Sequence, residues 1–84
     1  MTIQIHILGT GCARCEQLAA NAHAAANEIG KEFTLEKVSD ISQILQFGVL
    51  RTPALVVNGQ VRCSGTASNV EEIRAILRRV DDEV

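Results

Sequence analysis

The sequence contains neither tryptophan nor tyrosine, and its only aromatic residues are Phe33 and Phe47. A core built from these 84 residues must therefore be aliphatic, and there is little aromatic surface on which nucleic-acid bases could stack. Lysine and arginine are not gathered into one block, and the formal net charge is -2. Because phosphate binding needs a concentrated basic surface, we expect no nucleic-acid partner.

Long apolar runs are also missing. No stretch reaches the roughly 20 apolar residues that cross a bilayer, and the beginning of the chain lacks the charged segment and apolar core of a signal peptide. The sequence therefore predicts a cytoplasmic protein without a membrane partner. Its length suits a single domain over residues 1–84, for which a monomer is the default expectation.

Apolar periodicity predicts seven elements along the chain. Strands are expected at 2–8, 32–38, 54–57 and 60–64, and helices at 12–29, 41–48 and 70–80. Ser39 or Asp40 can cap the second helix, and Ser68 with Glu71 matches a capping box before the third. The pair Asn58-Gly59 predicts a tight hairpin.

The predicted order βαβαββα defines an α/β fold. Helices join the first three strands, so we expect those strands to be parallel. The last two strands form the antiparallel hairpin. The result is a four-stranded mixed sheet with helices on both faces.

Two of the three cysteines, Cys12 and Cys15, form a C-x-x-C pair at the start of the first helix. Residues three apart share a helical face, so the two sulfur atoms can approach each other. Backbone N–H groups and the helix dipole at this position lower a thiol pKa from about 8.5 to roughly 7 or below. Arg14, between the cysteines, adds positive charge. The pattern predicts Cys12 as the nucleophile and Cys15 as the resolving thiol.

The segments "ILGTGCARC" and "RTPALVVNG", together with the last helix, carry a resemblance that covers nearly the whole chain. The chain resembles the small thioredoxin-fold, glutaredoxin-like oxidoreductases of archaea and bacteria. The resemblance implies that Pro53 is cis and faces the cysteine pair, and that Thr52 offers its backbone to an extended substrate. Gly11 and Arg14 join these residues in the expected substrate-binding set.

The resemblance also points to a proton-transfer group. The buried acid of thioredoxins precedes the first cysteine by six residues, and that position here is His6. Lys37 is the nearest match to the lysine that often accompanies the acid. A histidine can exchange a proton near neutral pH, although a partly exposed strand histidine without a catalytic role is the simpler interpretation of His6.

The sequence thus predicts a thiol–disulfide oxidoreductase that reduces or exchanges disulfides in a protein substrate. Its redox group is the Cys12–Cys15 disulfide, and no bound cofactor or metal is expected. Electrons would come from a thioredoxin-reductase-like protein or from a thiol pool.

Two alternatives remain open at this point. "GTGCARC" also resembles the loop of heavy-metal chaperone domains, in which two thiolates bind a soft metal. The predicted order ends on a helix rather than on the strand of those domains, and the loop lacks their methionine. The chain could instead be a non-catalytic thioredoxin-fold interaction domain. For the third cysteine, Cys63, burial as a small apolar side chain is the simplest interpretation.

Overall fold

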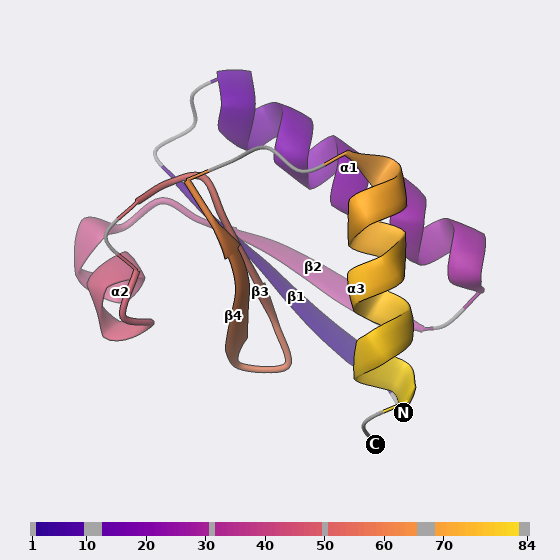
Figure 1. Ribbon diagram of the computed structural model, residues 1–84. Helices are drawn as coiled ribbons and strands as arrows, with labels where there is room; N and C mark the ends of the chain where they lie inside the picture. Colours follow the sequence, from indigo (N-terminus) through magenta and orange to yellow (C-terminus); the bar gives the residue numbers. More distant parts are fainter. Residues whose placement is uncertain (1, 10–12, 31, 50, 66–68, 83–84) are drawn as a thin grey trace.

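The computed structural model describes residues 2–9, 13–30, 32–49, 51–65 and 69–82. Within these residues the elements follow the predicted order βαβαββα. They are β1 (Ile3–Leu8), α1 (Ala13–Ile29), β2 (Phe33–Val38), α2 (Ile41–Gln46), β3 (Ala54–Val57), β4 (Gln60–Ser64) and α3 (Val70–Asp82). Together they form the α/β thioredoxin-type arrangement, with a mixed four-stranded sheet and helices on both faces (Figure 1).

The strand directions correct one expectation. The sheet has the order β2-β1-β3-β4, in which β1 and β2 are parallel but β3 is antiparallel to β1. Helix α2 has six residues and is therefore only about 9 Å long, whereas a six-residue strand spans about 20 Å. This helix is too short to return the chain along the whole strand, so β3 enters the sheet from the end at which β2 leaves it.

The larger core lies between the sheet and the helices α1 and α3, which cover the same face (Figure 1). Helix α1 contributes Ala22, Ala25 and Ala26, all with no exposed surface. Such small side chains let the helix axis approach the sheet closely. Leucine, isoleucine and valine fill the remaining space: Ile3, Ile5, Ile7, Leu18, Leu55, Val57, Ile73, Leu77 and Val80.

A smaller core lies on the opposite face, under α2. It consists of Leu8, Val38, Ile44, Val49, Ala54 and Val56, with Phe47 packed against them. Asp40 caps α2, because its Oδ1 accepts a hydrogen bond from Ser42 N at 2.8 Å. This helix leaves Ile41 and Leu45 exposed on its outer side.

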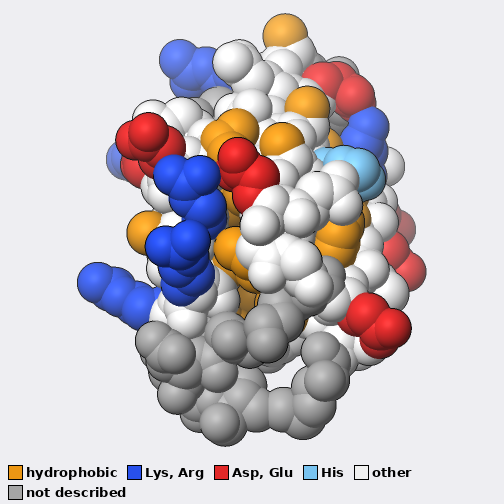
Figure 2. All heavy atoms as spheres, turned by 90° about the vertical axis from the view of Figure 1, so that its right-hand side faces the viewer, with side chains coloured by type: hydrophobic (Ala, Val, Ile, Leu, Met, Phe, Trp, Pro, Cys, Tyr) orange, Lys and Arg blue, Asp and Glu red, His pale blue; other side chains and the backbone are white. Residues whose placement is uncertain are grey.

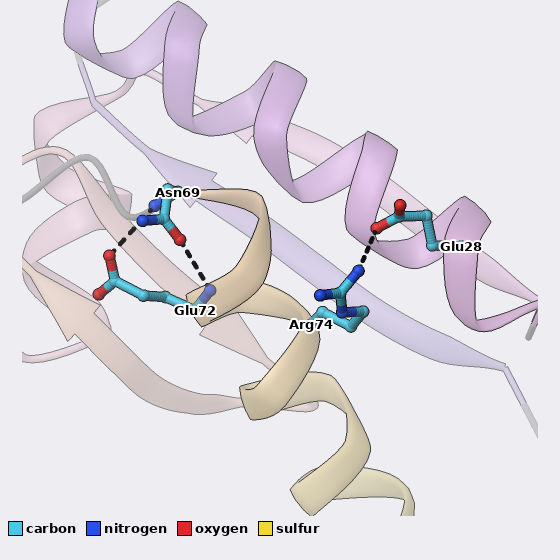
Figure 3. Close-up of polar contacts among 4 residues, drawn as sticks. All are labelled: Glu28, Asn69, Glu72 and Arg74. Atoms are coloured by element: carbon cyan, nitrogen blue, oxygen red, sulfur yellow. Dashed lines mark hydrogen bonds and ion pairs between the residues drawn. The ribbon is translucent and has the colours of Figure 1, made fainter.

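Helix α3 begins at Val70, as the predicted range 70–80 indicated, but its cap is Asn69; Ser68 lies outside the described residues. Asn69 Oδ1 accepts from Glu72 N at 2.8 Å, and Glu72 Oε1 accepts from Asn69 N at 3.5 Å (Figure 3). This reciprocal pair is a capping box and takes the place expected for Ser68 and Glu71. Asparagine fills the cap as well as serine does. One turn further on, Arg74 Nη1 donates to Glu28 Oε2 of α1 at 3.1 Å (Figure 3).

The outer surface of α1 and α3 is covered by charged and polar side chains, with hydrophobic atoms showing only in small separate areas (Figure 2). None of the helices in the described ranges is long and apolar enough to cross a membrane.

Candidate functional site

The candidate site lies where β1 ends and α1 begins. Leu8, the last residue of β1, is paired with Val38 at the end of β2 and with Ala54 at the start of β3. Gly9 follows, and its backbone N–H donates to Val38 O at 2.9 Å. The antiparallel entry of β3 therefore brings the segment before Ala54 to the same end of the sheet as the start of α1.

Cys15 lies in the first turn of α1 and is 5% exposed. Its side chain packs against Gly9: a Cβ added at Gly9 would collide with Cys15 Sγ and would lie 3.1 Å from Cys15 Cβ. The φ of Gly9 lies outside the left-handed region, unlike that of Gly30, Gly48, Gly59 and Gly65. Gly9 is therefore required for space around the sulfur, and not for an unusual backbone conformation.

Besides Gly9 and Cys15, the site contains Thr52 and Pro53 of the loop before β3. The peptide bond between them is cis, with Thr52 exposed and Pro53 buried. Thr52 Cβ lies 3.9 Å from the position that a Cβ of Gly9 would occupy. Pro53 O accepts a hydrogen bond from Gly65 N at 2.9 Å, which ties the loop before β3 to the end of β4. Cys15 and Thr52 therefore both lie beside Gly9, and Pro53 follows Thr52 through the cis peptide bond.

Two residues of the predicted set, Cys12 and Gly11, lie outside the described residues. In the sequence Cys12 immediately precedes Ala13, where α1 begins. Arg14, the second residue of α1, is exposed beside the buried Cys15. The exposure of Arg14 suits a residue that contacts another molecule. The burial of Cys15 suits a resolving thiol.

Lys37 lies on the α1 face of the sheet, since it is registered with Ile7 of the larger core. Its Nζ forms an ion pair with Glu16 Oε2 at 2.8 Å, next in sequence to Cys15. Glu16 is not among the site residues predicted from the sequence. Nothing in its spacing from Lys37 signals the contact, which arises only when α1 packs across β2.

His6 lies on the other face of the sheet. Its ring is 5.6 Å from that of Phe47, which packs on the smaller core, and its Nε2 is 3.7 Å from Glu36 Oε2. The neighbouring side chains of β1, Ile5 and Ile7, belong to the larger core on the α1 face. The structure therefore does not bring His6 to Cys15 or to Lys37.

Cys63 is half-buried in β4, opposite Leu55, and packs against the larger core. Its environment is that of a small apolar side chain. Within the ranges given above, no group of three or more His, Cys, Asp or Glu side chains is arranged to hold a metal ion.

With this geometry in place, comparison with known proteins identifies the family. The thioredoxin domain family matches residues 1–78, so the chain belongs to the thioredoxin family. A thioredoxin of Methanothermobacter thermautotrophicus is 40% identical over 75 residues, which cover 89% of this chain and 97% of the relative. A thioredoxin of Methanocaldococcus jannaschii is 33% identical over 76 residues, covering 90% and 87%. The family gives the chain a thioredoxin-like redox function in general terms.

Proposed function

We propose that the chain is a dithiol–disulfide oxidoreductase in which Cys12 is the nucleophile and Cys15 the resolving thiol. The observation that carries this proposal is the position of Cys15, buried in the first turn of α1 against Gly9 and close to Thr52. A thiol three residues after Cys12 in a helical turn can reach the sulfur of that residue. Its burial protects it from the substrate until the intramolecular step.

The proposed reaction has two exchange steps. The Cys12 thiolate attacks one sulfur of the substrate disulfide, whose S–S bond breaks as a mixed disulfide forms and the first substrate thiolate leaves. The Cys15 thiol then loses its proton, and its thiolate attacks Cys12 Sγ to release the second substrate thiolate. Two electrons pass from the protein dithiol to the substrate, and the two protons of the dithiol balance the two substrate thiols.

The residues proposed to bind the substrate are Thr52, Pro53, Gly11 and Arg14. Thr52 is exposed at the end of the sheet, and its backbone is not part of the β3 ladder, which begins at Ala54. An extended segment of substrate can therefore hydrogen-bond to this loop by strand addition. Arg14 supplies a positive charge beside the thiols, which favours the thiolate.

The redox group in this proposal is the Cys12–Cys15 pair itself, without a bound cofactor. The oxidised pair is returned to the dithiol by a thioredoxin-reductase-like protein or by a pool of small thiols. A cytoplasmic location suits this cycle, because the compartment keeps thiols reduced.

A single-turnover assay tests the proposal. The fully reduced chain is mixed with a protein disulfide, quenched in acid, and both partners are analysed for thiols by mass. We expect one disulfide to form between Cys12 and Cys15 for each substrate disulfide that is reduced. Cys12→Ser should abolish the reaction, whereas Cys63→Ser should leave it unchanged.

Metal content measured on the same samples separates the proposal from the metal-binding alternative. Purified chain that holds stoichiometric zinc or copper through its thiols and does not reduce the disulfide would contradict the proposal. A chain without metal that performs the exchange supports it.

A further inference from the structure

The side chain of Arg51, the residue immediately before Thr52, packs against the backbone of Gly65. The positions around Gly65 show this: a Cβ added there would lie 3.2 Å from Arg51 Cδ, 3.4 Å from Cβ and 3.9 Å from Cγ. The aliphatic part of Arg51 thus lies along the backbone of Gly65. Because Gly65 N is bonded to Pro53 O at 2.9 Å, this contact fixes the start of the arginine side chain to the loop that carries Thr52-Pro53.

The guanidinium group of Arg51 is not used inside the described part of the fold. Arg51 is exposed, and no carboxylate in the described ranges forms an ion pair with it. A long side chain ordinarily loses rotamer freedom when it binds a ligand. The contact with Gly65 already restricts the rotamers of Arg51, so the side chain loses less conformational entropy when it binds a ligand.

A second exposed arginine lies at the same end of the sheet. Arg14 is also exposed and has no carboxylate partner within those ranges, whereas the neighbouring Glu16 is already paired with Lys37. Arg14 of α1 and Arg51 of the loop before β3 therefore place two positive charges, without a carboxylate partner among the described residues, at the site end of the sheet. The Asp40 carboxylate at this end accepts a backbone hydrogen bond at the start of α2. An unpaired guanidinium group complements a carboxylate of a partner.

We propose that Arg51 selects disulfides flanked by acidic residues, its guanidinium binding a substrate carboxylate while Thr52 contacts the backbone of the substrate. This inference rests on the proposed function and specifies the chemistry of its substrate. It adds a binding contact to the site and leaves the exchange steps as written above.

Three synthetic peptides provide the test. Each contains one intramolecular disulfide and differs from the others only in the residue after one cysteine, which is Glu, Gln or Lys. Reduced chain is mixed with each peptide at low ionic strength, and single-turnover rate constants are measured. We expect the Glu peptide to react about threefold faster than the Gln peptide and the Lys peptide to react more slowly, an effect of the size of an exposed ion pair. The preference should shrink in high salt, because salt screens exposed charges.

Arg51→Gln is the informative variant, because glutamine keeps the Cβ, Cγ and Cδ atoms that pack on Gly65 and removes only the guanidinium. It should bring the rates for the Glu and Lys peptides close together without slowing the Gln peptide, and Arg51→Glu should reverse the order. The matched control is Arg78→Gln, which removes the same charge from the exposed side of α3, more than two helical turns from Asn69.

The outcomes distinguish a failure of the proposed selection by Arg51 from a failure of the proposed oxidoreductase function. If wild-type chain reduces all three peptides at equal rates, or if Arg51→Gln keeps the wild-type preference, the selection by Arg51 is wrong while the exchange chemistry stands. If wild-type chain reduces none of the peptides and forms no Cys12–Cys15 disulfide, the proposed function itself fails.

Discussion

At one end of the sheet, Asn58 and Gly59 connect β3 to β4 with positive φ values of 51° and 83°. A Cβ on Gly59 would meet open space, and the turn requires this glycine only for its backbone conformation. At the other end, Gly9 has no positive φ, but a Cβ there would collide with Cys15 Sγ. Gly59 at the hairpin is thus required for backbone geometry, whereas Gly9 at the site is required for the room that a sulfur atom needs.

The largest expected effect concerns the sulfur itself. Cys15→Ser removes the resolving thiol, so Cys12 should remain joined to the substrate as a mixed disulfide and turnover should stop. Mass spectrometry of the acid-quenched reaction measures the trapped complex. The same substitution at Cys63 should trap nothing. Release of reduced substrate at the wild-type rate from the Cys15→Ser variant would contradict the assigned roles.

The second prediction compares the two glycines directly. Gly9→Ala should lower the free energy of unfolding by about 1–3 kcal/mol, because it overpacks a closed site. Gly59→Ala should cost about 1–2 kcal/mol through its left-handed φ alone. Chemical denaturation measures both changes.

Gly9→Ala and Gly59→Ala are expected to lower the stability by similar amounts, so the reduction potential of the cysteine pair is the measurement that distinguishes them. Gly9→Ala displaces Cys15 Sγ and should change the reduction potential of the pair, whereas Gly59→Ala should leave the potential at the wild-type value. In a Cys15→Ala background the Gly9→Ala cost should largely disappear, because the colliding sulfur is gone. A cost that persists there would show that the backbone, and not the sulfur, requires Gly9.

A smaller effect is expected at the start of α3. Asn69→Ala removes the Oδ1 acceptor for Glu72 N and should cost about 1 kcal/mol of stability. Asn69→Ser keeps an acceptor at the cap and should recover most of the loss, as measured by thermal unfolding. A shift of the reduction potential in Asn69→Ala would show that this cap supports the redox site, contrary to the present account.

The smallest effect is expected for His6, which lies on the α2 face of the sheet with Phe47. His6→Gln should leave the single-turnover rate unchanged across neutral pH, because no proton passes between that face and Cys15. A change in the pH profile of the rate would restore the proton-transfer hypothesis. Lys37, on the α1 face beside Glu16, would then be the residue to vary next.

Local signals in the sequence predicted most of the fold. The alternating strand 2–8, the positive φ at Asn58-Gly59 and the glycines that follow α1 and α2 all depend on near neighbours, and they appear where expected. The direction of β3 did not follow from such signals, since it depends on how far α2 carries the chain. The shift of the α3 cap from Ser68 to Asn69 is likewise a choice between two adjacent residues of similar capping ability.

The site was predictable in its residue types but not in its contacts. The C-x-x-C spacing and the Thr-Pro pair identified Cys15, Thr52 and Pro53, because each carries a recognisable chemistry. The contact of Gly9 with Cys15 joins the end of β1 to the start of α1, and the contact of Gly65 with Arg51 joins the end of β4 to the loop before β3. They depend on strand register and helix packing, which a single sequence does not specify residue by residue.

The reduction potential of the Cys12–Cys15 pair shows whether these two cysteines form a redox couple. The Cys63→Ser variant, which retains only these two cysteines, is equilibrated in dithiothreitol redox buffers, and the oxidised fraction is measured by thiol labelling and mass. We expect a reversible two-electron transition between roughly -180 and -300 mV, the range of working redox proteins. A pair that forms no disulfide at any ratio of oxidised to reduced dithiothreitol would contradict it.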